Sequence, residues 1–209
     1  MTKAISKRKQ LGEDSRQRIL DAASEIAGAR GYEGTSINLI SQRAGLPASS
    51  IYWHFINKDE LLAAIIERSF ARWFDQCDWP ARDPRKACER QLAEILRVNA
   101  RAFVTSLDCL RLGLMLTLET RPDEPRARTL FLDVRRQTHQ RIVAGYQRFF
   151  GPELEAARAA TLARLTIALG DGLFIALRAE PEFDIEAQFE VMAAAVVGAA
   201  RRLGVEGTA

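Results

Sequence analysis

The sequence predicts an all-α protein of about nine helices, and three observations support this fold class. Ala, Leu, Arg and Glu dominate the chain, and they favour helices. No stretch shows the sustained period-two alternation of apolar residues that marks a strand. Apolar residues make up 47% of the 209 residues and charged residues 27%, which is ample for a core and ordinary for a soluble globular protein.

The first thirty residues are predicted to form a flexible arm followed by a helix. Residues 1–12 are basic and lack apolar periodicity, which predicts a flexible arm. Apolar residues at helical spacing predict a helix from Glu13 to Ala29, ended by Gly31. Through Arg18 the chain has six basic and two acidic residues, an excess of four positive charges that suits phosphate contact. A solvated tail would explain residues 1–10 equally well.

Residues 35–55 are predicted to form a helix-turn-helix. Thr35 or Ser36 would cap a helix that ends at Ala44, and Gly45 would permit a sharp turn. Pro47 can occupy the first turn of the next helix, which runs to about Phe55. In that helix Ile51 and Phe55 are expected to face the core. The outer face is left to Ala48, Ser49, Ser50, Tyr52, Trp53 and His54.

Six longer helices are predicted after the helix-turn-helix. Asn57 and Glu60 have the spacing of a capping box for the first of them, and Asp83 before Pro84 would cap the second. The predicted bounds are about 59–76, 83–106, 107–118, 126–150, 153–179 and 185–203. We find no secretory signal, and the apolar runs fall short of the roughly 20 residues that span a bilayer. A cytoplasmic protein without membrane contact is therefore expected.

From Arg18 to Ala64 the sequence resembles the tetracycline-repressor (TetR) family of bacterial regulators. The matching segments are RILDAASEIAGARGYEGTS, ISQRAGLPASSIYWHF and NKDELL, in the family's order and spacing. The resemblance implies a DNA-binding domain at 13–58 and a helical effector-binding and dimerisation domain at 59–209. It also implies a homodimer, formed through the last two long helices, that binds a palindromic operator in double-stranded DNA. The residues expected at the dimer seam are Leu165, Ala168, Leu169, Leu173, Met192, Ala195, Val196 and Ala199.

The same resemblance implies which residues contact DNA. Thr35, Ser36 and Lys58, each near the start of a helix, would bind phosphate. In the helix after the turn, Ser49 and Ser50 would approach base edges. Its aromatic residues Tyr52, Trp53 and His54 would reach phosphates and thymine methyls. That helix has no Arg to bind a guanine, so readout would depend on hydroxyl and apolar contacts. Arg43 could equally be a solvated charge. The candidates are Thr35, Ser36, Arg43, Pro47, Ala48, Ser49, Ser50, Tyr52, Trp53, His54 and Lys58.

The later helices offer candidates for a small-molecule site, although aromatic residues at helical spacing are also ordinary core. These candidates are Trp73, Asn99, Phe103, Met115, His139, Tyr146 and Phe174. We find no nucleophile signature, phosphate loop or metal-binding spacing, so neither catalysis nor a cofactor is expected. The sequence therefore predicts a homodimeric regulator, a repressor released by a small-molecule effector. The alternative is a helical carrier or sensor of small molecules without operator binding.

Overall fold

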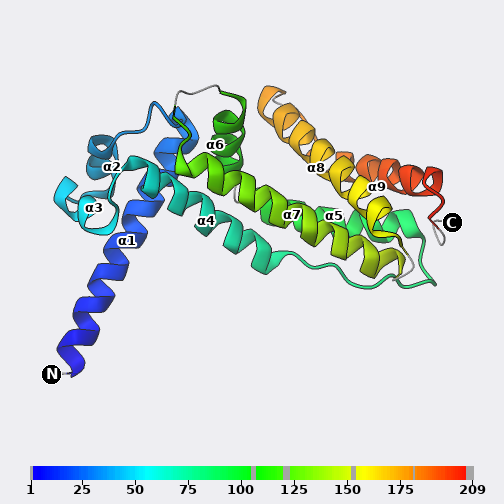
Figure 1. Ribbon diagram of the computed structural model, residues 1–209, viewed down its shortest axis with the longest axis horizontal. Coiled ribbons are helices and arrows are strands. Elements are labelled where there is room, and N and C mark those ends of the chain that lie inside the picture. Colours follow the sequence, from blue (N-terminus) through cyan, green and yellow to red (C-terminus); the bar gives the residue numbers. More distant parts are fainter. Residues whose placement is uncertain (1, 105–106, 120–122, 152–153, 181, 206–209) are drawn as a thin grey trace. The chain divides into compact units, whose positions relative to one another are not determined.

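The regular secondary structure in the described part of the protein is all helical (Figure 1). The computed structural model describes residues 2–104, 107–119, 123–151, 154–180 and 182–205, without the side chains of 2–9, 100, 102–104 and 107–108. The predicted all-α class with about nine helices is confirmed. The helices are α1 (Thr2–Arg30), α2 (Ile37–Ala44), α3 (Ala48–His54), α4 (Lys58–Gln76), α5 (Cys88–Val104), α6 (Leu107–Leu118), α7 (Arg126–Phe150), α8 (Ala156–Ala179) and α9 (Ile185–Arg202).

The first helix differs from its prediction. α1 begins at Thr2, whereas the sequence predicted a flexible arm over residues 1–12 and a helix from Glu13. The segment before Gly12 contains neither Gly nor Pro, and its Lys, Arg, Gln and Leu residues are good helix formers. Once α1 is nucleated by its packed part, each added residue of this kind extends it at little cost in free energy.

The start of α5 also differs, because Asp83 and Pro84 belong to a turn. The Asp83 carboxylate accepts a hydrogen bond from the Arg85 backbone N–H at 3.0 Å. The Gln91 side chain accepts from the Asp83 N–H at 2.8 Å and donates to the carbonyls of Asp83 and Lys86. These bonds hold the segment as a turn, and α5 begins only at Cys88.

Two compact units make up the chain, Met1–Arg72 with Ser106–Val134 (unit 1) and Trp73–Thr105 with Arg135–Ala209 (unit 2). The boundary predicted at residue 58 falls inside unit 1. Asn57 caps α4 as predicted, and α4 buries Leu61 and Ile65 among the residues of unit 1.

The core of unit 1 is built around α1, which packs against α2, α3 and α6. Ile19 of α1, Ile40 of α2 and Ile51 of α3 are fully buried, and this confirms the core faces expected for these helices. Gly113 of α6 lies against the ring of Phe131, where an added Cβ would come within 2.1 Å of a ring carbon. Glycine therefore permits the close approach of α6 and α7.

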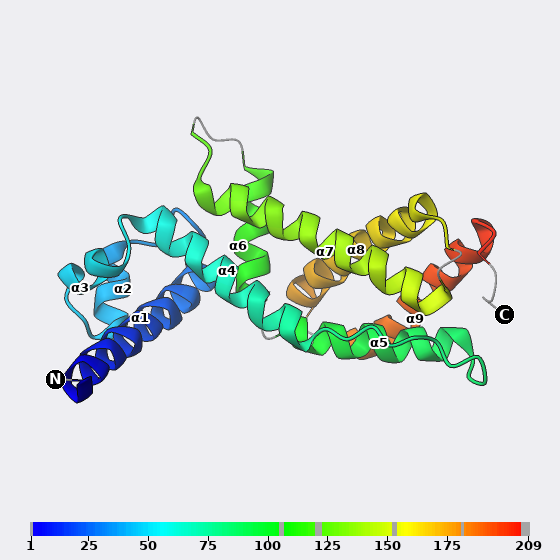
Figure 2. The ribbon, with the colours of Figure 1, turned by 60° about the horizontal axis from the view of Figure 1, so that its bottom comes forward.

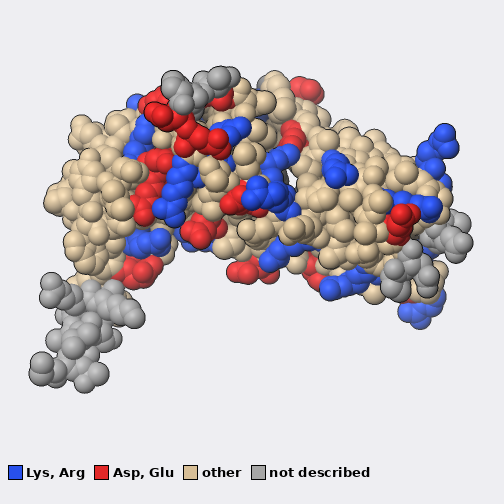
Figure 3. Space-filling view, viewed as in Figure 1, with Lys and Arg blue, Asp and Glu red and all other residues tan. Residues whose placement is uncertain are grey.

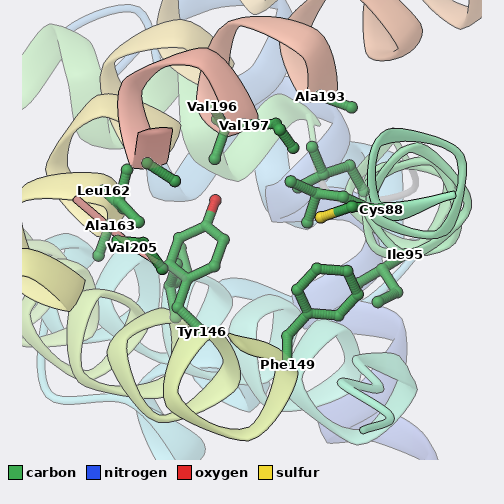
Figure 4. Packing of buried hydrophobic residues seen from close by; sticks show 14 of the residues in the cluster. Cys88, Ile95, Tyr146, Phe149, Leu162, Ala163, Ala193, Val196, Val197 and Val205 are labelled. Carbon is green, nitrogen blue, oxygen red and sulfur yellow. The ribbon is translucent and has the colours of Figure 1, made fainter. Parts of the chain in front are cut away.

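The core of unit 2 joins α5, α7, α8 and α9 (Figure 4). Tyr146 of α7 is fully buried, and its hydroxyl hydrogen-bonds the hydroxyl of Thr166. Because Thr166 donates its own proton to the Leu162 carbonyl at 2.9 Å, Tyr146 is the donor in this pair. Burial raises the pKa of the Tyr146 phenol. Other members of the cluster are Cys88, Ile95, Phe149, Ala163, Ala193, Val196, Val197 and Val205.

α8 is unusually apolar for a helix with so much exposed surface. Among the described helices it alone is long and apolar enough to cross a membrane, by length and composition only, and 22% of its most apolar window is buried. Figures 1 and 2 both place it beside α9, with which it packs. Two residues expected at a dimer seam on α9, Met192 and Val196, instead lie in the core of unit 2, because they face α5 and α8.

Candidate nucleic-acid interface

The turn between α2 and α3 is fixed by local hydrogen bonds. Ser36 caps α2, its hydroxyl accepting a hydrogen bond from the Leu39 N–H at 3.3 Å. Gly45 ends α2 in the left-handed region with a φ of 62°, which a residue with a Cβ rarely adopts. The Ser41 hydroxyl donates to the Leu46 carbonyl at 2.6 Å, and the Leu46 N–H returns a bond to the Ser41 carbonyl. The predicted cap and turn residues are confirmed.

Arg18 of α1 reinforces this turn, a role that the sequence did not reveal. Its guanidinium donates to the Ala44 carbonyl at 2.7 Å and to the Gly45 carbonyl at 3.4 Å. The last carbonyls of a helix carry partial negative charge, so a cation here stabilises the end of α2. No local pattern could indicate a contact that spans 26 residues. Arg18 is therefore a support for the turn, although the excess of positive charge through this residue had suggested a phosphate contact.

The outer face of α3 carries large side chains with no core to enter. Tyr52 is 57% exposed and Trp53 is 76% exposed, whereas Ile51 and Phe55 are buried as expected. Ser49 and Pro47 are also exposed, and Ala48, Ser50 and His54 are half-buried. Residues 35–56 include no Asp or Glu, and the lobe of α2 and α3 in Figure 3 shows no acidic atoms. This face can therefore approach a polyanion without acidic repulsion from its own helices.

His54 lies at the end of this face, edge-on to Trp53 with 4.6 Å between ring centroids. Burial and the nearby Arg16 guanidinium lower its pKa from the ordinary 6.5, against the opposing effect of Glu13. The imidazole of the free protein is therefore mostly neutral at neutral pH. A phosphate placed beside it would favour the charged form.

Two predicted phosphate contacts are occupied by other partners. Thr35 is 1% exposed, and its hydroxyl donates to the Gly31 carbonyl at 2.7 Å. Its side chain therefore cannot reach a ligand without breaking that bond. Arg43 forms an exposed ion pair with Glu25 at 2.7 Å. An exposed pair of this kind contributes little to stability, so Arg43 can leave it for a phosphate at small cost.

Lys58, at the start of α4, is held in place by Tyr32. Its ammonium donates to the Tyr32 carbonyl at 3.1 Å and lies 4.5 Å from the centroid of the Tyr32 ring. The capping box predicted for this helix is present in shifted form. The Glu60 N–H donates to the Asn57 side chain at 2.8 Å, but the Glu60 carboxylate accepts from the N–H of Ile56 rather than of Asn57. The first turn of α4 is thus rigidly defined around Lys58.

Asp59, the next residue, joins this turn to the start of α7. One carboxylate oxygen accepts from the Arg126 N–H at 2.7 Å, and the other accepts from the Ala127 N–H at 3.2 Å. The Tyr32 hydroxyl donates to the second oxygen at 3.3 Å. Asp59 therefore satisfies free N–H groups at the start of another helix, 67 residues away in sequence. Only the fold brings these groups together, so no local sequence pattern could indicate them.

The candidates for a small-molecule site are mostly engaged within the protein. The Trp73 indole donates to the Asn99 carbonyl at 2.9 Å, and the Asn99 side chain exchanges two hydrogen bonds with the Asp78 backbone. A ring nitrogen of His139 lies 3.2 Å from the Ala160 carbonyl. Tyr146 and Phe174 are buried, the half-buried Met115 belongs to unit 1, and the side chain of Phe103 lies outside the described residues.

Comparisons with known proteins agree with this arrangement. A family model described as bacterial regulatory proteins of the tetR family matches residues 19–65. The chain is 31% identical over 124 residues to the tetracycline repressor protein class D of Escherichia coli, covering 59% of this chain and 54% of that protein. It is 40% identical over 63 residues to the regulator AcrR of Shigella flexneri, covering 30% of this chain and 29% of AcrR. The matches thus span about half or less of these relatives.

Solved structures extend the likeness to most of the fold. A complex of SmeT with triclosan aligns with a TM-score of 0.67 at 23% identity, covering 89% of this chain and 91% of SmeT. The fatty acid degradation regulator FadR of Bacillus halodurans aligns with a TM-score of 0.66 at 15% identity, covering 87% of this chain and 93% of FadR. At these identities the likeness concerns the fold alone. Residues 19–65 thus match the tetR family of bacterial regulatory proteins, and most of the chain shares the fold of these solved structures.

Proposed function

We propose that the protein is a homodimeric DNA-binding transcriptional regulator of the cytoplasm. It would act as a repressor that a small-molecule effector releases from a palindromic operator. Each α3 would enter a major groove, where Ser49 and Ser50 approach base edges and Tyr52, Trp53 and His54 reach the backbone. The observation that carries the proposal is the exposed aromatic face of α3, followed in sequence by Lys58, whose ammonium is held by Tyr32.

DNA binding is tested by the variants Tyr52→Ala and Lys58→Ala. The probe is a duplex selected by the wild-type protein from a random-sequence pool. Each substitution removes an interaction in every half-site, so we expect the dissociation constant to rise by about tenfold or more in a gel-shift titration. Leu118→Ala and Lys86→Ala are matched controls, since both residues are exposed and lie outside the helix-turn-helix. Affinities equal to wild type for both test variants would contradict the proposal.

Operator affinity is expected to increase as the pH falls from about 8 to about 6, because of His54. The pKa of this residue is lowered in the free protein, with Arg16 and Glu13 as the charged neighbours. A phosphate would raise that pKa, so DNA binding would take up a proton and weaken as the pH rises. Titrations of the selected duplex across this range measure the effect, which His54→Gln should abolish. A wild-type affinity that does not change with pH would rule out the phosphate contact.

The dimer would form through the exposed stripes of α8 and α9. Ala168, Gly172 and Ile175 lie on the exposed side of α8, and Val191 and Gly198 on that of α9. Apart from the backbone of its own helix, a Cβ added at either glycine would meet no atom within 4 Å. These small and apolar residues would allow a second copy to pack closely. The apolar character of α8 supports this interpretation, since only 22% of its most apolar window is buried in one chain.

The effector that releases the operator would be a small molecule bound by the helices after the helix-turn-helix. SmeT, whose structure contains triclosan, supports a small-molecule site in a helical body of this fold. A reporter gene behind the selected duplex distinguishes repression from activation. If the protein binds no duplex from the pool and yet binds small molecules, the alternative of a carrier or sensor without operator binding is favoured.

A further inference from the structure

The helical start of α1 is strongly basic. Between Thr2 and Leu11 the sequence has four cations, Lys3, Lys7, Arg8 and Lys9, and no acidic residue. The segment is therefore a continuous helix with a charge of +4 that precedes the packed part of unit 1.

This charge pattern disfavours an isolated helix. A cation in the first turn opposes the helix dipole, and α1 has no acidic residue in that turn. Lys3 and Lys7 are four residues apart, a spacing at which like charges repel on a helix surface. Each effect costs a few tenths of a kcal/mol or more. An anion bound along the segment would remove both penalties.

The segment begins beside the candidate DNA-binding face. Gly12, directly after it, lies against the exposed ring of Trp53, since a Cβ added there would meet that ring at 3.8 Å. Glu13 and Arg16, one turn further, are close enough to His54 to influence its pKa. In Figure 1 the first turns of α1 extend beyond α2 and α3. The basic segment therefore continues from the place where α3 would meet DNA.

The length of the segment fits several phosphates. Ten residues of α-helix extend about 15 Å at roughly 1.5 Å per residue. Duplex DNA carries one negative charge per roughly 1.7 Å of its axis, so a helix of this length passes several phosphates. The four cations need no particular base sequence, because phosphates are the same in every sequence.

We propose that Thr2–Leu11 binds the phosphate backbone of the DNA that flanks each half-site. This rests on the proposed function, because it assumes that α3 places the protein on a duplex. The segment adds affinity without sequence preference, whereas α3 supplies the preference. It is thus a second DNA-contacting surface, outside the helix-turn-helix.

The test variant carries Lys3→Gln, Lys7→Gln, Arg8→Gln and Lys9→Gln. The control carries Arg85→Gln, Lys86→Gln, Arg90→Gln and Arg148→Gln, which remove the same charge from unit 2. Affinity is measured at several salt concentrations on the selected duplex, once with long flanks and once trimmed to the half-sites. We expect the slope of log K against log salt to decrease in the test variant by about 0.9 for each phosphate that is no longer neutralised, and to stay unchanged in the control. Trimming the flanks should produce the same decrease of slope in the wild type.

Equal slopes for the wild type and the test variant on the long duplex would overturn the inference. A variant lacking residues 2–9 must give the same result as the test variant, which guards against an effect of the glutamines themselves. If the test variant loses binding to phosphatidylserine vesicles but keeps the DNA slope, the segment binds membranes and the inference is wrong. If the wild type binds no duplex, the proposed function fails as well, whereas equal slopes with intact binding refute only this inference.

Discussion

Replacing Gly172 or Gly198 by Glu is expected to convert the dimer into monomers and to abolish tight operator binding. Both glycines lie on the exposed stripes of α8 and α9 that we propose as the dimer seam. Two-fold symmetry brings each substitution into the interface twice. A buried, unpaired carboxylate costs about 3–5 kcal/mol, so even one of the two would raise the dimer dissociation constant by a factor on the order of 100 to 5,000.

The same substitutions should leave the single chain intact. Apart from the backbone of its own helix, a Cβ at either position meets no atom within 4 Å, and both positions are exposed in the single chain. Replacing Gly by Glu within a helix also gains about 0.5–1 kcal/mol of helix propensity. The test therefore separates association from folding, because the two effects have opposite signs.

Sedimentation equilibrium gives the dimer dissociation constant, circular dichroism monitors the fold, and gel shift reports operator binding. Ala144→Glu is the matched control, since Ala144 belongs to α7, outside the seam, and is not part of the buried core. If either Glu variant remained as strongly dimeric as this control, the seam would have to lie elsewhere. A monomer that binds the duplex as tightly as wild type would show that dimerisation is not needed for operator binding.

The predictions from sequence succeeded where the signal is local. The caps at Ser36 and Asn57, the turn at Gly45 and the buried Ile51 depend on residues within one or two turns of each other. Periodicity and cap chemistry act over that distance, so they are visible in the sequence. The α7 bounds, 126–150, were likewise predicted correctly, with Pro125 and Gly151 as neighbours.

The predictions failed where residues have competing local roles or distant partners. Asp83 with Pro84 has the chemistry of a helix cap, but Gln91, eight residues later, stabilises a turn instead. The Thr35 hydroxyl was expected at a phosphate, yet it donates to Gly31, because the residue is buried. The apolar surface of α9 could not be divided into core and seam from the sequence, since both are apolar. Burial of Met192 in the core is decided by tertiary packing alone.

Asp59→Ala is expected to weaken operator binding by about tenfold while leaving its salt dependence unchanged. The carboxylate binds the N–H groups of Arg126 and Ala127 at the start of α7, and the hydroxyl of Tyr32. Tyr32 in turn holds the ammonium of Lys58 through its carbonyl. Loss of the carboxylate frees the first turn of α4, so the Lys58 ammonium would spend less time in position. A tenfold change corresponds to about 1.4 kcal/mol, within the range measured for loss of a helix cap.

The salt dependence distinguishes a positioning residue from one that binds phosphate directly. Lys58→Ala removes a charge that we propose to bind phosphate. The slope of log K against log salt should therefore decrease by about 0.9 for each phosphate that is left without a cation. Asp59→Ala keeps that charge and should therefore give a line parallel to wild type. Glu67→Ala, an exposed carboxylate further along α4, is the control for the removal of a negative charge.

Asp59→Asn tests whether the hydrogen bonds accepted by this side chain are what matters. Its amide keeps one of the two oxygen acceptors and should therefore recover part of the affinity. If affinity were unchanged in Asp59→Ala, the bond between α4 and α7 would serve stability alone. If affinity falls as expected, the start of α7 and the position of the Lys58 ammonium both depend on the Asp59 carboxylate. A ligand that favours a displaced α7 would then weaken operator binding. Operator binding would weaken the binding of that ligand by the same free energy, since the coupling between two binding equilibria is reciprocal.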